Sequence, residues 1–538
     1  MKKIGKIIIL FSGILLLGSL AANACTNFIV TKGASSTGSA YLLYTCDGEF
    51  LYKLQLKPGK VFGADEYITY GSNRIKQVQQ TYNVVGNHIN EYQLAIGETT
   101  FTGREELISE KNFLDYWELM GLTLQRSKTA REAIKVMTDF VEEYGYGSEG
   151  ESFSIVDPNE AWILEMIGNG SNGKGAIWVA VKIPDGMVAA HANHSRIGAF
   201  PLNDPENCIY SKNVISFAVE KGYYNPKSGK PFEFNNAYDP ANAEKLKYSE
   251  TRVWSLFRRA APSLNLSSDF HRGLSDRPYP LYIKPDKKLN TLEVFNLVRD
   301  HYEGTPFDMT QGLDAGSYNT PQRNRPLPFY VDSVKYSFER PISSYTTSFS
   351  FVAQLRANLP NEIGGLLWFG FDDTYFTCYT PLYCSINNLP ESFGKGEEHK
   401  FSRESAWWVF NFVSNYSNLA YRDMVKDMQN VQYGLESGFV QKQDSVENAA
   451  LILFKSNKAK AIQFLTETSV NAGNKVIKQW LELGDFLIAK YNDGYIRDAK
   501  GDTKENGYPK EWYRRVIKDN PEKYRIKDAT QENQVKSL

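Results

Sequence analysis

Cys25 stands where an apolar leader ends, directly after Ala22, Asn23 and Ala24. An A-x-A pattern is typical of signal-peptidase cleavage, so a cut after Ala24 would make Cys25 the first residue of the mature chain. A terminal cysteine carries a nucleophilic thiol and a free α-amine, whose ordinary pKa of about 7.7–8.0 suits it to act as a base. The position therefore predicts covalent catalysis that needs no distant histidine.

The leader has the charge pattern of an export signal. Lys2, Lys3 and Lys6 form a positive start, and an apolar run over residues 7–17 follows. This run is shorter than the roughly 20 residues that a membrane-spanning helix needs, and no later segment of the sequence is long enough to span. We therefore interpret residues 1–24 as a signal peptide and expect a periplasmic or secreted protein.

Lipoprotein processing is the alternative fate of a cysteine at this place, because acylation would consume the same amine. Lipoprotein leaders usually place Leu three residues before the cysteine, where this chain has Ala22. The leader therefore favours a free amine. The alternative left open is a lipid-anchored surface binding protein in which Cys25 is only the attachment point.

Composition bounds the remaining function classes. Hydrophobic residues make up 42% and charged residues 23% of the chain, as in ordinary globular proteins. The formal net charge of −1 argues against a nucleic-acid or anionic-membrane partner. Homo-oligomerisation stays open. The state of the other four cysteines also stays open, because they could form disulfides in any of three connectivities or remain free thiols. These cysteines are Cys46, Cys208, Cys378 and Cys384.

The first part of the chain alternates short strands with two helices. Apolar runs predict strands at residues 28–30, 40–44, 82–85, 93–96, 153–156, 161–164 and 177–181. Helical spacing predicts helices at 113–125 and 129–144, the second with Thr129 as N-cap and Gly145 as its stop. This order indicates an α+β protein built in layers.

The rest of the chain has longer connections and then becomes helical. Short helices are expected at 249–259 and 292–302, and strands at 348–359 and 365–371. Beyond residue 402 the apolar spacing predicts helices at 405–428, 445–456 and 476–491. The last stretch, from residue 498, is charged and poor in aliphatic residues.

Several motifs are weak matches. Residues 168–173 fit GxGxxG, but a strand is predicted directly after them, so no helix N-terminus is available for phosphate. His191 and His194 are predicted on a strand, which places them on opposite faces and argues against a metal pair. The sequence contains neither HExxH nor GxSxG. We therefore expect no metal and no cofactor.

A series of short blocks follows Cys25 in order along the chain. They lie at residues 25–27, 30–35, 38–39, 47, 97–100, 103–104, 161–162, 165, 178–180, 184–186, 192–197, 248–254, 303–308, 364–365 and 368–370. Each block is weak alone, but together they resemble the C69 dipeptidases, which are N-terminal-nucleophile hydrolases, and more distantly the choloylglycine and penicillin V acylases. The resemblance runs from Cys25 to about Tyr421.

The resemblance implies an αββα sandwich of two antiparallel sheets and hydrolysis of dipeptides or short peptides. It implies that Cys25 is the nucleophile and that Asp47 steadies its amine. Asn193 matches an asparagine that binds oxyanion or substrate, and Arg252 matches an active-site arginine. Without the resemblance, Asp47 could simply end a strand in a turn, and Arg252 could form a surface ion pair.

This chain departs from its relatives at two points. Many relatives carry Arg-Asn or His-Thr just before the acid, whereas this chain has Thr45 and Cys46, so it has no arginine at that place. Glu98 and Thr99 lie near the position where acylase relatives have a second oxyanion asparagine. A carboxylate would repel an oxyanion, so we expect a backbone N–H of this segment as the donor.

These expectations divide the chain into four parts. They are a signal peptide at 1–24, an N-terminal-nucleophile hydrolase domain at 25–401, a helical region at 402–497 and a charged tail at 498–538. The predicted activity is a cysteine dipeptidase that works through an acyl-enzyme. An amidase of the choloylglycine or penicillin acylase type is the enzymatic alternative, because the acyl-transfer chemistry would be the same.

Overall fold

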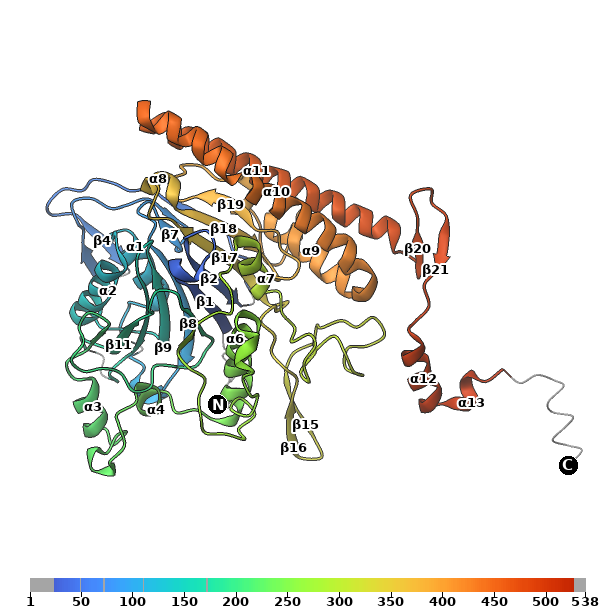
Figure 1. Cartoon of the computed structure of the whole chain (residues 1–538), viewed down its shortest axis with the longest axis horizontal. Coiled ribbons are helices and arrows are strands. Elements are labelled where there is room, and N and C mark those ends of the chain that lie inside the picture. Colours follow the sequence, from blue (N-terminus) through green and yellow to red (C-terminus); the bar gives the residue numbers. More distant parts are fainter. Residues whose placement is uncertain (1–23, 49, 71–72, 110, 171–172, 527–538) are drawn as a thin grey trace, which may run out of the picture.

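The computed structural model describes residues 24–48, 50–70, 73–109, 111–170 and 173–526. Of the predicted signal peptide only Ala24 is among them; the rest lies outside the described residues. Two antiparallel sheets form the centre of the body, with helices outside them (Figure 1). The expected α+β class with antiparallel sheets and a helical C-terminal region is confirmed.

The first sheet has seven strands in the order β14-β12-β1-β2-β17-β18-β19. Their bounds are β1 Ala24–Val30, β2 Ala40–Asp47, β12 Val188–His191, β14 Tyr282–Ile283, β17 Thr347–Leu355, β18 Leu366–Phe371 and β19 Thr380–Tyr383. Strands β2, β17 and β18 are buried along their whole length. This burial explains their nearly unbroken apolar runs, because both faces of the sheet are covered.

The second sheet has eight strands in the order β13-β11-β10-β9-β8-β7-β6-β3. Their bounds are β3 Leu56–Lys57, β6 Val84–Val85, β7 Ile89–Asn90, β8 Ala95–Thr102, β9 Gly150–Val156, β10 Ala161–Ile167, β11 Ile177–Lys182 and β13 Cys208–Tyr210. Strands β1 and β2 of the first sheet contact β8 of the second. The two sheets therefore pack face to face at the point where β1 carries Cys25.

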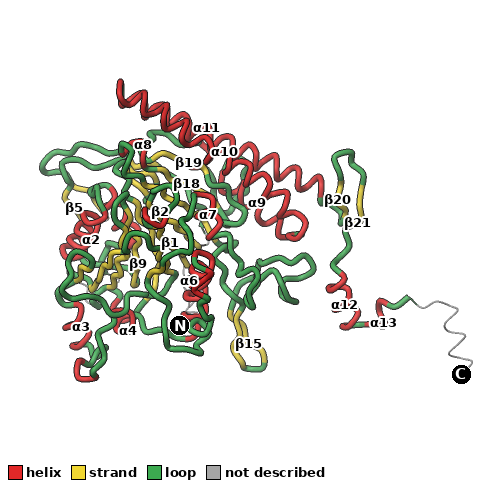
Figure 2. The backbone as a smooth tube through the Cα atoms, viewed as in Figure 1, coloured by secondary structure: helices red, strands yellow, loops and turns green. Residues whose placement is uncertain are grey.

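Helices cover the outer faces of both sheets, and Figure 2 shows the yellow strands enclosed between them. Helices α1 (Tyr116–Leu124) and α2 (Ala130–Tyr144) pack on β8, β9 and β10, while α6 (Thr251–Ala260), α9 (Ala406–Asn418) and α11 (Lys458–Lys490) contact β12, β18 and β19. The expected cap of α2 is confirmed, since Thr129 accepts a hydrogen bond from the Glu132 N–H and Gly145 ends the helix with φ of 77°.

Shorter elements occupy the connections. They are α3 Val214–Glu220, α4 Phe234–Tyr238, α5 Ala243–Lys245, α7 Thr291–Leu297, α8 Asn361–Gly364 and the hairpins β4 Tyr67–Tyr70 with β5 Asn73–Lys76 and β15 Pro328–Val331 with β16 Val334–Ser337. The helix expected at 292–302 is therefore too long at its C-terminal end. Asp300 leaves the helical path, and its buried carboxylate accepts a hydrogen bond from the Ser255 hydroxyl of α6.

The predicted boundaries of the C-terminal helices are wrong in three places. The helix expected at 476–491 is only the second half of α11, which begins at Lys458. The helix expected at 405–428 breaks after α9, and α10 (Tyr421–Ser456) continues without interruption to the end of the segment expected at 445–456. Ala420 leaves the helical conformation, with φ of −143° and ψ of 56°, and Met424 and Met428 of the helix that follows are buried in the core. The apolar spacing continues across this break, so the sequence does not show it.

Helices α10 and α11 form a long antiparallel hairpin across the top of the body in Figure 1. The segment after α11 contains the hairpin of β20 (Tyr495–Arg497) and β21 (Thr503–Glu505), then α12 (Lys510–Asp519) and α13 (Pro521–Tyr524), and it extends away from the body. Within the described ranges, no helix combines the length and the apolar character of a membrane span.

Candidate active site

Cys25 lies in the middle of the molecule, on β1, and is only 1% exposed. In the antiparallel register of β1 and β2 it pairs with Cys46, while Ala24 pairs with Asp47. Its backbone N–H donates to Asn193 Oδ1 at 3.1 Å. Its thiol donates to Glu98 Oε1 at 3.5 Å.

The surroundings of the thiol keep it protonated. Burial raises the pKa of Cys25 well above its ordinary value, and the negative charges of Glu98 and Asp47 raise it further. The Tyr44 hydroxyl lies 3.7 Å from Sγ and donates a hydrogen bond to the Glu98 carboxylate. The resting group is therefore a thiol, and a nucleophilic attack needs a base that removes the proton during the reaction.

Asn193 follows β12 and adopts a left-handed backbone conformation with φ of 57°. Asparagine tolerates this conformation better than most residues, and here it directs the amide towards β1. Nδ2 donates to the Thr100 carbonyl at 2.6 Å, which fixes the amide so that Oδ1 faces the Cys25 nitrogen. The predicted site residue thus contacts the nitrogen that would become the α-amine.

Arg252 reaches the same point from α6 and is fully buried. Nη1 donates to the Cys25 carbonyl at 2.7 Å and to Thr26 Oγ1 at 2.9 Å, and Nη2 donates to Asn193 Oδ1 at 2.8 Å. Burial lowers its pKa to about 10, which still leaves it charged at neutral pH. A surface ion pair is therefore the wrong interpretation of Arg252.

Asp47 ends β2 and is buried next to the start of β1. Its carboxylate accepts hydrogen bonds from Thr347 Oγ1 at 2.6 Å and from Arg340 Nη2 at 3.3 Å. Burial raises the pKa of Asp47, and the Arg340 guanidinium opposes that rise. An arginine therefore does stand beside the acid, but it comes from residue 340 and not from the positions just before Asp47.

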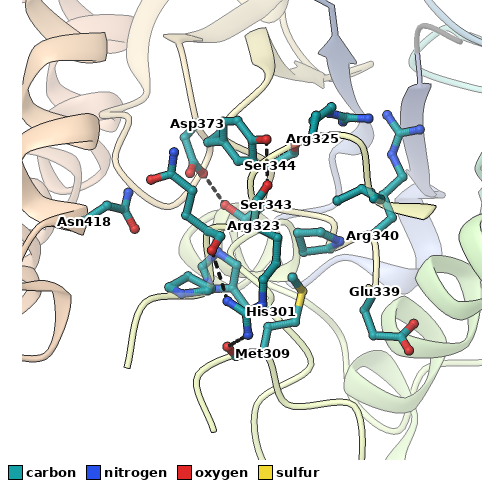
Figure 3. A pocket seen from close by; sticks show the side chains of 15 residues that line it. His301, Met309, Arg323, Arg325, Glu339, Arg340, Ser343, Ser344, Asp373 and Asn418 are labelled. Carbon is teal, nitrogen blue, oxygen red and sulfur yellow. Dashed lines mark hydrogen bonds between the residues drawn. The ribbon is translucent and has the colours of Figure 1, made fainter. Parts of the chain in front are cut away.

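Arg340 separates the site from a narrow polar cavity behind it. Figure 3 shows His301, Asp373 and Arg340 around this cavity, with a dashed line between Ser343 and Asp373. Glu303 accepts from the His301 ring at 3.1 Å. Ser343 lies three residues after Arg340, so its hydrogen bond to Asp373 helps to hold the loop that carries Arg340.

Sequence reasoning missed two buried side chains, Tyr44 beside Cys25 and Glu151 beside Glu98. Glu151, on β9, is buried close to Glu98, and burial and the Glu98 charge raise its pKa well above its ordinary value. Thr100 Oγ1 donates to Glu151 Oε2 at 3.1 Å. Tyr44 lies two residues before Cys46 on β2, so strand alternation could have placed both on the face next to Cys25.

A pocket of about 230 Å³ opens beside the Cys25 contacts. Its wall combines Asn193, Arg252 and Arg340 with one further cation, Lys245, and two acids, Glu149 and Glu244. Burial raises the pKa of Glu149, and the Lys245 charge opposes the rise. The pocket therefore presents charges of both signs beside Asn193 and Arg252, the two residues that contact the backbone of Cys25.

The weaker motifs have structural roles. His191 accepts or donates at Thr99, Ser154 and Asn27, whereas His194 contacts Glu250, so the two imidazoles do not share a site. The GxGxxG segment leads into β11, as expected, and not into a helix. All five cysteines lie within the described residues and are buried free thiols.

Comparison with known proteins gives consistent matches. The chain is 26% identical to a "Probable dipeptidase" of Salmonella dublin over 404 residues, covering 71% of this chain and 86% of that protein. It is 26% identical to a "Probable dipeptidase" of Latilactobacillus sakei, covering 72% and 79%, and 24% identical to "Dipeptidase A" of Lactobacillus helveticus, covering 60% of each.

The model of peptidase family C69 matches residues 60–434. This range contains Asn193, Arg252 and Arg340 and begins downstream of Cys25 and Asp47, whose importance is therefore argued from their geometry. The match covers most of the chain and agrees with the resemblance of its ordered sequence blocks. The chain belongs to peptidase family C69.

Proposed function

We propose that the protein is an exported cysteine dipeptidase whose nucleophile is Cys25 at the N-terminus of the mature chain. The observation that carries this proposal is the convergence on Cys25. Asn193 contacts its nitrogen, Arg252 its carbonyl and Glu98 its sulfur. The relatives named as dipeptidases support the substrate class. The two face-to-face sheets agree with the sandwich of N-terminal-nucleophile hydrolases.

Cleavage after Ala24 would create the catalytic base. In the uncleaved chain the Cys25 nitrogen belongs to an amide, whose lone pair is delocalised into the carbonyl. Removal of Ala24 takes away the residue that pairs with Asp47 in the register, so the new terminus at Cys25 is the β1 residue that adjoins this position. Asp47 then faces an amine, and its carboxylate stabilises the ammonium form that appears during the reaction.

The reaction follows from these positions. The Cys25 sulfur attacks the scissile carbonyl while its S–H proton passes to the α-amine. The resulting ammonium returns the proton to the leaving amine as the C–N bond breaks, which gives an acyl-enzyme and releases the first amino acid. Water then attacks the thioester, giving the second product and restoring the thiol.

The pocket beside the site fits a short substrate. Its volume of about 230 Å³ lies below the roughly 300–1,000 Å³ that is typical of pockets for larger ligands. A dipeptide carries an ammonium at one end and a carboxylate at the other, and the two groups are only a short distance apart. Acids such as Glu149 and cations such as Lys245 provide partners for both.

The proposal is tested with the mature chain against a panel of dipeptides, longer peptides and N-acyl amino acids. We expect dipeptides to be hydrolysed with the highest kcat/KM, because both charged ends find partners. Preference for N-acyl amino acids would instead identify an amidase. The mass of the mature N-terminus is measured in parallel: a free Cys25 amine is expected, and an acyl adduct on Cys25 would contradict the mechanism.

Asp47→Asn should change the pH dependence of the reaction. The neutral amide no longer favours the ammonium, so the amine loses its proton at lower pH and the acidic limb of the kcat/KM profile moves to lower pH. The lost orientation of the amine lowers the maximal rate. Measured pH profiles of the two proteins check this, and an unchanged acidic limb would remove Asp47 from the proposed mechanism.

A further inference from the structure

Cys46 is a buried thiol that the proposed reaction does not use. It lies opposite Cys25 in the register of β1 and β2. The Cys25 sulfur, the Cys46 sulfur and a Glu98 carboxylate oxygen all lie within 4.8 Å of one another. Within the described part of the chain, no other group of three such ligand atoms is as compact.

We propose that Cys25, Cys46 and Glu98 form an inhibitory binding site for a thiophilic divalent cation such as Zn²⁺. The proposal rests on the proposed function for its consequence, since a metal bound to the Cys25 sulfur removes the nucleophile. Zinc accepts a donor set of two sulfurs and one oxygen. Calcium and magnesium prefer oxygen ligands and do not accept this donor set.

The geometry is close to that of a zinc site. Tetrahedral bonds of about 2.3 Å to sulfur and 2.1 Å to oxygen place those two ligand atoms about 3.6 Å apart. The Cys25 sulfur and Glu98 Oε1 are 3.5 Å apart. Two sulfurs on one zinc are about 3.8 Å apart. The Cys25 and Cys46 sulfurs lie within 4.8 Å of each other, which is compatible with this distance. Small side-chain rotations therefore suffice.

The surroundings also suit a metal. Tyr44 donates a hydrogen bond to the Glu98 carboxylate, which is how outer groups orient metal ligands. Arg252 is bonded to the Cys25 carbonyl and offsets the negative charge of two thiolates and a carboxylate around one dication. Once Cys25 is the terminal residue, its amine can complete four-coordination in a five-membered N,S-chelate with its own sulfur.

Binding exchanges protons for metal without any change of oxidation state. Two S–H bonds break, two metal–sulfur bonds form and two protons leave, with a third when an ammonium becomes the fourth ligand. The affinity should therefore rise steeply with pH. Cys46 thus has a defined role in metal binding that hydrolysis itself does not require.

The test uses the mature chain, reduced with a non-chelating phosphine and kept free of oxygen. Co²⁺ is added first, and the sulfur-to-cobalt charge-transfer absorption is recorded without substrate. Zn²⁺ is then titrated in competition with Co²⁺, and separately against the hydrolysis of a dipeptide. We expect the absorption to appear, Zn²⁺ to displace it, and inhibition to follow the same Zn²⁺ concentration dependence.

Cys46→Ser is the decisive variant, and Cys208→Ser, at a buried thiol of β13 in the other sheet, is its matched control. Loss of a group that only orients a metal ligand already weakens metal binding 10–100-fold. Loss of a direct ligand should therefore lower the affinity for Zn²⁺ at least about tenfold. The control should bind as the unaltered chain does. Glu98→Gln keeps both thiols, so it should lower the affinity for Zn²⁺ while the sulfur-to-cobalt charge-transfer absorption remains.

Unchanged Zn²⁺ affinity in Cys46→Ser, or no charge-transfer absorption in the unaltered chain, would overturn the site. Because the absorption is measured without substrate, this result is separate from the proposed function. A chain that binds Co²⁺ as expected but hydrolyses no dipeptide would retain the metal site and contradict the dipeptidase. Mg²⁺ and Ca²⁺ at the same concentrations should neither bind nor inhibit.

Discussion

Cys25→Ala is expected to abolish dipeptide hydrolysis, with kcat/KM lowered by roughly 10⁴–10⁶, the range found when a covalent nucleophile is removed. The alanine keeps the amine, the Asn193 contact and the Arg252 contact, which all involve backbone atoms of residue 25. Only the attacking sulfur is lost. Initial rates on the preferred dipeptide, with the variant processed to the same N-terminus, measure the effect.

The loss must be separated from misfolding. Removing one buried sulfur atom deletes little volume, so the destabilisation should stay near about 1 kcal/mol and the thermal midpoint should fall by only a few degrees. Cys208→Ala removes a comparable buried thiol from the other sheet and should retain hydrolysis. Turnover by Cys25→Ala above a small residual rate would contradict the assignment of the nucleophile.

The fold was predictable where local chemistry determines it. The cap at Thr129, the stop at Gly145 and the buried strands are signalled by residues within a few positions of each boundary. The end of α7 and the break before α10 depend instead on distant contacts, such as the hydrogen bond from Ser255 to Asp300. Apolar spacing carries no information about such contacts.

The site shows the same division. Cys25 and Asp47 could be found because the leader and the family blocks mark them, and β1 and β2 then bring them together. Arg340 contacts Asp47 although the two residues are 293 positions apart in the sequence, and no sequence motif predicts this contact. The segment of Glu98 and Thr99 was expected to supply a backbone N–H donor, and the contact between the Glu98 carboxylate and the sulfur was not foreseen. The backbone oxyanion donor from its segment stays a prediction.

A mature chain that keeps Ala24 in front of Cys25 should lose activity even though every side chain of the site is present. The Cys25 nitrogen would then be an amide and could not accept the thiol proton. General-base assistance typically contributes 10²–10⁴-fold, so kcat/KM should fall by about that factor relative to the chain that begins at Cys25. Rates of the two forms on the same dipeptide measure the difference.

This comparison also decides between two bases. The Glu98 carboxylate is 3.5 Å from the sulfur, close enough to take its proton, and it is the same in both forms. Retained turnover in the form with Ala24 would therefore assign the base to Glu98 and contradict the amine. Proton transfer to the amine places a positive charge beside the thiolate, and proton transfer to Glu98 removes a negative charge from beside it. The net charge of the site is the same in both cases, so turnover of the form with Ala24 decides between the two bases. In the proposed mechanism, loss of turnover in the form with Ala24 would make cleavage after Ala24 the activating step, because cleavage supplies the free amine that the uncleaved chain lacks.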